Sequence, residues 1–360
     1  MGSRIKVTWN AARALVGPVR ISLTKLDVAI ALYAGLASFT AIRYLAEAQG
    51  RSVALIALLS IPMALLLRSQ PRLAAAAMIV GATILRAAHV GLFPTDPLES
   101  AHDAFGRILA GQNPYGAQSD GPTYAYGPLG LLVFQLGIPG EIAAAAGTSI
   151  VLAWQRAWIT LALFSSYPLL LFTASTGAND HTPTFLLSLG LVLLRTHPKS
   201  GAAVIACAVA VKPYAAAWIL PAVGVGGVPV LAIGAATTAV LWAPLLVWGP
   251  ALFLESLGVL ESGWVIARKI HASSNWGMDV PVLRWLAVPL TVTALFVRSW
   301  RAACLLGAAA FAAYLGFAPW ANLAHFVPIV AVTGLAVESP RVPPIAWPTG
   351  LAPPRQSDPP

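Results

Sequence analysis

The stretch DPLESAHDAFGRILAGQNPYGAQSDGPTYAYGP, from Asp96 to Pro128, is the longest polar interval in an otherwise apolar chain. Asp96 is a suitable helix cap, Pro97 a suitable first helical residue and Gly111 a suitable end. Four apolar residues recur at helical spacing on one face: Ala101, Phe105, Ile108 and Leu109. Three charged residues occupy the other face: Glu99, Asp103 and Arg107. The stretch therefore predicts an amphipathic helix, followed by a rigid turn at Asn113-Pro-Tyr.

The composition around this stretch indicates a membrane protein. Of the 360 residues, 58% are hydrophobic and 10% are charged, and the mean hydropathy is +0.76. Soluble domains carry about 25% charged residues. We therefore expect an all-α polytopic membrane protein with roughly 9–11 transmembrane helices, some of them broken. Between two spans, the amphipathic helix would lie along the bilayer surface, in contact with membrane lipids and with its acids toward water.

Basic residues indicate how the chain is oriented. The net charge of +9 is typical of membrane proteins with basic cytoplasmic loops. No basic patch interleaved with aromatic residues points to nucleic acid as a partner. We expect a cytoplasmic basic segment at 1–26 and a single transmembrane domain at 27–337, with external loops at 94–127 and 249–279. The segment 338–360 holds eight prolines and predicts a disordered cytoplasmic tail.

The interval around Lys212-Pro213 allows two paths through the membrane. A full crossing would put the loop 249–279 in the cytoplasm. A break at Lys212-Pro213, followed by a turn at 224–227, would put that loop outside. Proline breaks helices, and broken helices at membrane depth are tolerated where they line a cavity. We therefore prefer the broken hairpin, and as a consequence the unusual polar residues lie on the external side.

Three charged or titratable residues are candidates for chemistry, and each has a plainer alternative. Asp103 is either a general base for a hydroxyl nucleophile or a solvated acid paired with Arg107 one turn later. Lys212 either binds a lipid phosphate or is a snorkelling or ion-paired lysine. His325 either orients substrate and carries a proton or is simply hydrogen-bonded. For Arg86, near a span end, we expect snorkelling.

Further residues on the external side are candidates for binding substrate. Asn179, Asp180 and His181 either contact sugar hydroxyls or form a turn in which Asp180 caps the next helix. Arg268 and Lys269 either contact a phosphate or are solvated. Aromatic and amide side chains complete the set: Tyr115, Tyr124, Tyr126, Asn275, Trp276 and Asn322. No nucleotide-binding, metalloprotease or serine-nucleophile motif occurs, and we assign no cofactor or metal ligand. Binding of a divalent ion by the carboxylates of Asp96, Glu99, Asp103 and Asp180 remains an open alternative.

Several short motifs follow one another along residues 96–330. They are Asp103, Gly111-Gln-Asn-Pro-Tyr115, Tyr124-Ala-Tyr-Gly-Pro-Leu129, Gly177-Ala-Asn-Asp180, Lys212-Pro-Tyr214 and His325. Together they resemble the membrane glycosyltransferases of the GT-C superfamily. The closest match is glycosyltransferase family eighty-seven, which contains polyprenol-phosphate-mannose-dependent mannosyltransferases of phosphatidylinositol mannoside synthesis. Gly127 stands where that family usually has the first of two prolines.

This resemblance implies a GT-C-like bundle and an inverting sugar transfer. The sugar, mannose in that family, would pass from a polyprenyl-phosphate donor to a lipid or glycan hydroxyl outside the cytoplasmic membrane. Asp103 would deprotonate the acceptor, and Lys212 with Arg268 or Lys269 would stabilise the departing phosphate. His325 would position donor or acceptor. The aromatic residues would stack on sugar rings, and both termini would be cytoplasmic.

Two other functions remain open at this stage. A flippase or transporter of lipid-linked sugars would need polar residues on both sides and at mid-membrane, whereas here they gather on one side. A non-catalytic protein of polysaccharide assembly would tolerate Asp103→Asn.

Overall fold

Long runs of alanine, leucine and valine fold as helices, because a helix satisfies its backbone polar groups within one segment. The computed structural model describes residues 5–6, 22–45, 51–88, 90, 96–116, 123–257, 281–316 and 323–340. Apart from a two-residue pairing of β1 (Ile5–Lys6) with β2 (Ser22–Leu23), the elements in these ranges are helical. The all-α expectation is therefore confirmed.

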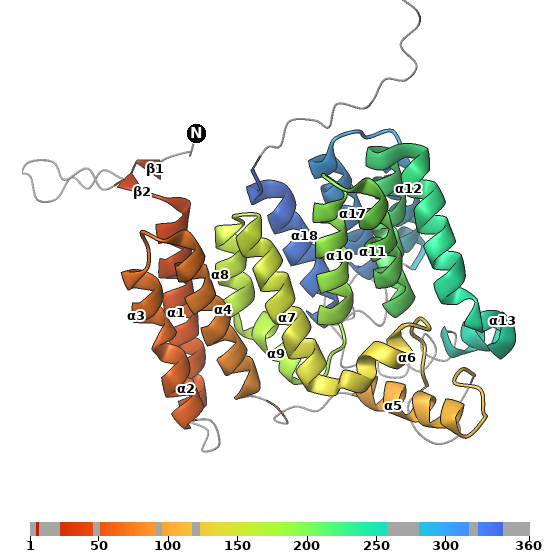
Figure 1. Cartoon of the computed structure of the whole chain (residues 1–360), viewed down its shortest axis with the longest axis horizontal. Helices are drawn as coiled ribbons and strands as arrows, with labels where there is room; N and C mark the ends of the chain where they lie inside the picture. Colours follow the sequence, from red (N-terminus) through yellow and green to blue (C-terminus); the bar gives the residue numbers. More distant parts are fainter. Residues whose placement is uncertain are drawn as a thin grey trace, which may run out of the picture.

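The helices form one bundle (Figure 1). Its first part contains α1 (Lys25–Leu45), α2 (Arg51–Leu58), α3 (Ser60–Leu66), α4 (Pro71–Ala87) and α5 (Asp96–Leu109). Its middle part contains α6 (Gly130–Val133), η1 (Phe134–Leu136), α7 (Gly137–Trp154), α8 (Trp158–Ser166), α9 (Pro168–Ser175) and α10 (His181–Leu193). The next elements are α11 (Pro198–Val211), η2 (Pro213–Trp218), α12 (Ile219–Trp242) and α13 (Pro244–Trp248). The last are η4 (Pro281–Leu286), α16 (Ala287–Ala294), α17 (Trp300–Gly316), η5 (Leu323–Phe326) and α18 (Val327–Glu338).

Several helices have the length and composition of membrane spans. Within the described ranges, three pass both tests: Lys25–Ile42, Gly130–Trp154 and Pro213–Trp248. A fourth results if the α8–α9 pair, bent by 58°, is counted as one span. Large apolar side chains such as Leu66 and Phe296 face outward. These helices and their apolar surface indicate association with a membrane.

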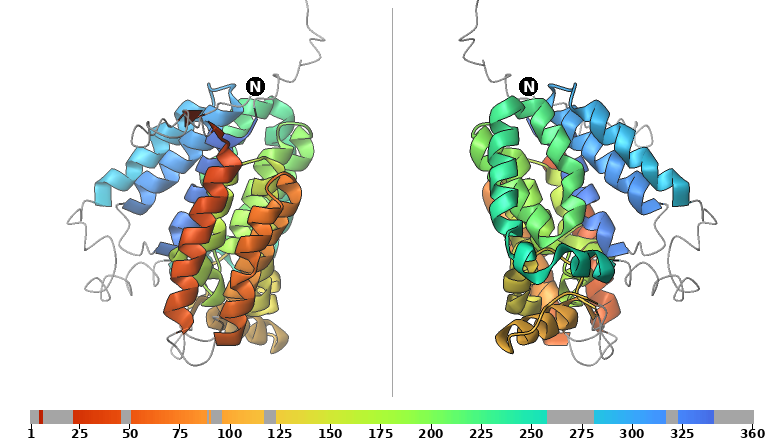
Figure 2. Two further views of the ribbon diagram at one scale, coloured as in Figure 1. Left: turned by 90° about the vertical axis from the view of Figure 1, so that its left-hand side faces the viewer. Right: turned by 90° about the vertical axis from the view of Figure 1, so that its right-hand side faces the viewer.

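The amphipathic helix predicted after Asp96 is α5, which lies across one end of the bundle (Figures 1 and 2). Its buried residues Leu98, Ala101 and Ala104 pack in one cluster with the aromatic side chains that follow it. Glu99 and Asp103 are exposed, as expected for its polar face. Leu109 was expected on the apolar face but is the last residue of α5 and is 75% exposed.

The chain is broken at Lys212, as the preferred path requires. α11 ends at Val211, Lys212 is extended, and α12 follows the short η2. α12 then reverses direction at Gly227, whose φ of 67° and ψ of −158° are not helical. Figure 2 shows the two arms of α12 joined at the end of the bundle away from α13. Loop 249–279 lies mostly outside the described residues, and its side of the membrane stays a prediction.

The apolar segment that starts near Gly127 is expected from its sequence to be broken at Ile138-Pro139-Gly140, and a break is present next to that site. The chain bends at Gly137, which has a φ of 60°. Glycine suits this position because its backbone adopts positive φ without steric cost. The bend separates η1 from α7 and directs α6 toward α5.

At the end of the bundle away from α5, basic side chains bind backbone carbonyls. Arg298 donates to Gly224 O at 2.7 Å, and Arg195 donates to Pro340 O at 2.8 Å. The last carbonyls of a helix have no partner within the helix, so nearby cations stabilise them. Arg298 therefore also caps the first arm of α12, at the end of the bundle for which a cytoplasmic position is expected.

Candidate functional site

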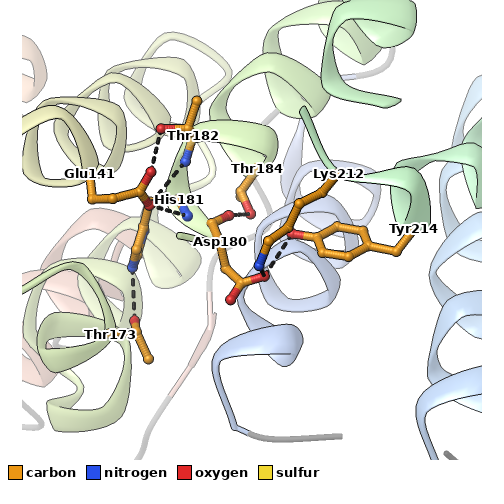
Figure 3. A network of polar contacts seen from close by, with 8 residues as sticks. All are labelled: Glu141, Thr173, Asp180, His181, Thr182, Thr184, Lys212 and Tyr214. Carbon is orange, nitrogen blue, oxygen red and sulfur yellow. Dashed lines mark hydrogen bonds and ion pairs between the residues drawn. The ribbon is translucent and has the colours of Figure 1, made fainter. Parts of the chain in front are cut away.

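A buried ion pair joins two segments far apart in the sequence. Lys212 Nζ lies 2.9 Å from Asp180 Oδ1, and the two side chains are 4% and 3% exposed. The hydroxyl of Tyr214 donates to the same Asp180 oxygen at 2.9 Å (Figure 3). Of the alternatives for Lys212, snorkelling is excluded and ion pairing is observed. A phosphate at Lys212 would compete with Asp180 for the ammonium.

Aromatic rings enclose the rest of the lysine ammonium. Lys212 Nζ lies 5.0 Å from the ring centroid of Tyr126 and 5.6 Å from that of Tyr214. Tyr214 stacks on Phe311 with centroids 4.7 Å apart, and the ring of His325 lies 6.2 Å from that of Tyr214. Cation–π contacts of this kind are worth more when water is excluded. The expected residues Tyr126, Lys212 and His325 are therefore brought together.

The position of Lys212 follows from the proline after it. Pro213 has no N–H and ends α11, so the last carbonyls of that helix need donors from elsewhere. Gly127 N donates to Val211 O at 3.1 Å, and Leu129 N donates to Ala210 O at 3.0 Å. A β-carbon at Gly127 would overlap the carbonyl oxygen of Ala210. The glycine that departs from the family pattern is thus required by this close approach.

A carboxylate on another helix caps the start of α10. Glu141, in α7, accepts the backbone N–H of His181 at 2.8 Å and that of Thr182 at 3.3 Å. It also accepts the hydroxyl of Thr182. Asp180 stands at the N-cap position but makes no side-chain cap, so the expected capping by Asp180 is wrong. Its carboxylate is occupied by Lys212 instead.

The charge of Asp180 is stabilised in its turn between α9 and α10. Burial on its own raises the pKa of a carboxyl group. The nearby charges of Lys212 and His325 and the hydrogen bonds from Lys212 and Tyr214 outweigh burial, and the pKa of Asp180 is lowered to about 2. Asp180 is therefore an anion at every physiological pH.

Two neighbours of Asp180 are fully buried with unused polar atoms. The Nε2 atom of His181 lies 2.8 Å from Thr173 Oγ1, whereas its Nδ1 has no partner in the described part of the chain. Neither polar atom of the Asn179 amide has one in those ranges. An unsatisfied buried polar group costs about 1–3 kcal/mol, so this turn has capacity for further hydrogen bonds. Contact with sugar hydroxyls stays a prediction.

Arg86 is a second buried cation in the same region. Its side chain is 0% exposed, and its Nη2 donates to Phe164 O at 2.7 Å. Within the described ranges, Nε and Nη1 have no hydrogen-bond partner. Its guanidinium carbon lies 5.6 Å from the Phe164 ring centroid, and His181 packs against the same ring. The snorkelling expected for Arg86 is therefore wrong, because α8 covers the end of α4.

The tyrosines expected to stack on sugars are packed inside the protein. Tyr115 and Tyr124 are buried, with ring centroids 5.6 Å apart. The hydroxyl of Tyr115 donates to Tyr126 O at 3.1 Å, and that of Tyr124 donates to Gly127 O at 2.8 Å. Asn113 Oδ1 accepts the N–H of Tyr115 at 2.9 Å, which forms the expected rigid turn. These residues hold the segment against α11, and stacking on a sugar stays a prediction.

Asp103 stands apart from the buried pair. It is exposed on α5, at the same end of the bundle as the turn before α10. No ion pair between Asp103 and Arg107 is found in the described ranges, where the single ion pair is Lys212–Asp180. The solvated half of the plainer alternative is observed, since Asp103 is exposed, whereas its pairing with Arg107 is not found among the described residues. A role of Asp103 as a general base stays a prediction.

Five expected site residues lie outside the described residues: Arg268, Lys269, Asn275, Trp276 and Asn322. Among the residues that are described, no group of three or more histidine, cysteine, aspartate or glutamate side chains could hold a metal ion. The described part of the candidate site thus consists of the turn at Asp180, the break at Lys212 and α5.

Glu141 was not among the expected site residues. It is a lone acid in an apolar helix, and such residues usually face a partner or a cavity. That signal was present in the sequence and could have singled it out. The pairing of Asp180 with Lys212 carries no local signal, because it depends on how α10 and α11 pack.

Comparison with known proteins gives no further guide to this site. No protein-family model matches the chain, and neither a curated protein nor a solved structure is found to be similar to it.

Proposed function

We propose that this chain is an integral membrane glycosyltransferase with a GT-C-like bundle of roughly 9–11 transmembrane helices. It would transfer a sugar, mannose by resemblance, from a polyprenyl-phosphate donor to a lipid or glycan hydroxyl. The reaction would take place on the extracytoplasmic face of the cytoplasmic membrane, with both termini in the cytoplasm. No cofactor is invoked.

The observation that supports this proposal best is the direct contact between two of the family-like motifs. The backbone of Gly127 and Leu129 is hydrogen-bonded to the last turn of α11, next to Lys212. Tyr126 of the first motif lies over the Lys212 ammonium of the second. Weak motifs that are unrelated in function have no reason to meet around a buried cation.

In the proposed reaction, the acceptor hydroxyl attacks the anomeric carbon of the sugar. The new carbon–oxygen bond forms as the bond to the phosphate oxygen breaks, and the electron pair leaves with the phosphate. Asp103 takes the acceptor proton. The Lys212 ammonium would move from Asp180 toward the phosphate and stabilise its charge. A phosphate is a good leaving group, so a second carboxyl acting as an acid is not needed.

The test is sugar transfer by purified protein supplied with radiolabelled polyprenyl-phosphate mannose and membrane-lipid acceptors. Asp103→Asn should lower the rate by at least about 10²-fold, because loss of a general base costs this much. Glu99→Gln removes an exposed acid one turn earlier on α5 and should leave the rate within about twofold of wild type. Unchanged transfer in Asp103→Asn would rule out Asp103 as the base. Failure of the wild type with every polyprenyl-phosphate sugar would overturn the enzymatic proposal.

A transporter of lipid-linked sugars is the second candidate. Buried ion pairs and cations among apolar helices are typical of transport pathways, and Asp180, Lys212 and Arg86 provide them. Proteoliposomes separate the two functions, because a transporter moves a labelled lipid-linked sugar between leaflets without forming a new glycoside. A glycosyltransferase forms the glycoside and leaves unreacted donor in its original leaflet.

A further inference from the structure

The first turn of α10 has two backbone N–H groups that no carbonyl within the helix can accept. They belong to His181 and Thr182, because the next residue is Pro183, which has no N–H. The N–H of Thr184 already binds the carbonyl of Asp180 at 3.2 Å. Glu141 accepts both free donors from α7. The capping requirement of α10 is therefore met entirely by a residue outside it.

Asp180 is the N-cap residue of α10, the position whose side chain usually caps a helix. An aspartate at the N-cap position normally accepts the N–H two or three residues ahead. For α10 the only such donor is the N–H of Thr182, which is 3.3 Å from Glu141 Oε2. The carboxylate of Asp180 turns instead to Lys212 and Tyr214. Glu141 and Asp180 could each accept the N–H of Thr182, and in the structure Glu141 accepts it.

We propose that Glu141 is a positioning residue for Lys212, acting through Asp180. By capping α10, Glu141 leaves Asp180 without a competing backbone donor and keeps its carboxylate on the lysine ammonium. Removal of Glu141 lets Asp180 swing to the N–H of Thr182, and Lys212 then loses its counter-charge. Only the idea that a phosphate takes the place of Asp180 rests on the proposed function.

The same arrangement sets how an anion reaches Lys212. An incoming phosphate competes with the Asp180 carboxylate, which already neutralises the ammonium at 2.9 Å. A displaced carboxylate needs new donors, and the nearest backbone donor is occupied by Glu141. Glu141 therefore favours return of Asp180 to Lys212 once the anion has left. In this way it keeps the site closed between turnovers.

The experiment measures the reactivity of Lys212 in the purified full-length protein in detergent. Limited acetylation with acetic anhydride at fixed pH is followed by mass spectrometry of the peptide that carries Lys212. The exposed Lys199 serves as the internal reference. Acetic anhydride attacks the neutral amine, and an ion pair disfavours that form. Asp180→Asn should therefore raise the relative rate at Lys212 by about tenfold or more.

Glu141→Ala should raise the relative rate at Lys212 nearly as far as Asp180→Asn does. Glu141→Gln keeps one acceptor oxygen and should give an intermediate rate. Glu338→Ala is the matched control, since Glu338 caps α8 in the same way but has no contact with Lys212 in the described ranges. Its rate at Lys212 should equal that of the wild type. Equal rates in Glu141→Ala and the wild type would overturn the proposal.

The double variant Glu141→Ala/Asp180→Asn separates this route from general loosening of the fold. If Glu141 acts through Asp180, the double variant reacts no faster than Asp180→Asn alone. A further increase would show that Glu141 acts on Lys212 directly, through its own nearby charge or by covering the lysine, and would overturn the positioning role. Sugar transfer is measured separately, in the same preparations. Absence of transfer with an intact Lys212 response overturns the proposed function alone, and normal transfer without that response overturns the positioning role alone.

Discussion

Helices α8 and α10 both begin beneath a glutamate from another helix, but the two regions use this device differently. Glu338 of α18 accepts the N–H of Ile159 at 2.9 Å and that of Thr160 at 2.8 Å. The N-cap residue of α8 is Ala157, which has no acceptor of its own. The N-cap residue of α10 is Asp180, which could cap but does not. Capping by another helix is needed at α8, which has no acceptor of its own. At α10 it leaves the Asp180 carboxylate available to bind Lys212.

The surroundings differ in the same sense. Around Glu338, α18 packs so closely on α8 that the backbone of Gly334 meets Thr160 directly. Around Glu141, the turn before α10 carries an ion pair and the polar atoms of Asn179, which have no hydrogen-bond partner among the described residues. Folds tolerate such costs mainly at functional sites. The comparison therefore indicates a packing role for the α8 region, and it places the buried charges in the α10 region, to which we assigned the proposed chemistry.

The largest difference between the regions should appear when a buried charge is left alone. Lys212→Met strips Asp180 of its counter-charge, and loss of one partner of a buried pair costs about 3–5 kcal/mol. Equilibrium unfolding in mixed detergent micelles measures this cost. The double variant Lys212→Met/Asp180→Asn should recover part of it, because no charge is then unpaired. A cost for Lys212→Met below about 1 kcal/mol would contradict the ion pair.

A second test addresses packing in the α8 region. In Gly334→Ala the new β-carbon would overlap the side chain of Thr160, which also donates to Glu338. Overpacking of this kind costs about 1–3 kcal/mol, measured by the same unfolding transition. Gly35→Ala is the control, since a β-carbon at Gly35 meets nothing within 4 Å. That control should be neutral or stabilising by up to about 1 kcal/mol. Equal effects at the two glycines would remove the packing role.

A smaller effect is expected from the caps themselves. Glu338→Ala leaves the first turn of α8 without an acceptor, at a cost of about 0.5–2 kcal/mol. Ala157→Asp places an acceptor at the N-cap and should restore most of that loss in the double variant. Glu141→Ala should lose more stability than Glu338→Ala, because Asp180 can take over the cap only by leaving the buried Lys212 ammonium without its counter-charge. If Glu141→Ala proves the less costly, Asp180 stays on Lys212 and the comparison fails.

The smallest expected effect is the change in ionisation of Asp180 between pH 5 and pH 8. Its pKa is lowered from 3.8 to about 2, so its ionisation stabilises the fold above pH 3.8. That contribution is lost only as the pH falls through about 2. The infrared carboxylate band that is absent from Asp180→Asn should therefore have the same intensity in wild type at pH 5 and pH 8. Loss of the band by pH 5 would show that Lys212 does not hold the charge.

Much of this architecture could be predicted from the sequence, because it rests on local patterns. The helix that begins at Asp96, its end shortly before Gly111 and the break before Pro213 are marked by a proline in the first turn, a glycine with positive φ and a missing N–H. Each of these acts within a few residues. The apolar composition likewise indicated a membrane protein, which the long apolar helices support.

The candidate site was harder to predict, because its contacts join distant segments. Asp180 looks locally like an N-cap, and only the position of Glu141 shows that the cap is already occupied. Arg86 looks like a residue at a span end, and only the packing of α8 buries it. In both cases tertiary packing overrides a sound local expectation. A lone intramembrane acid such as Glu141 was the best available clue.

The docking of Gly127 and Leu129 on α11 also constrains the order of assembly during synthesis. This segment leaves the ribosome well before its acceptors at Ala210 and Val211 exist. Its backbone donors must stay hydrated until α11 has inserted, so the segment joins the bundle late. Nascent chains stalled before Pro198 should accordingly be cleaved by protease near Gly127, and chains extended past Trp218 should be protected there.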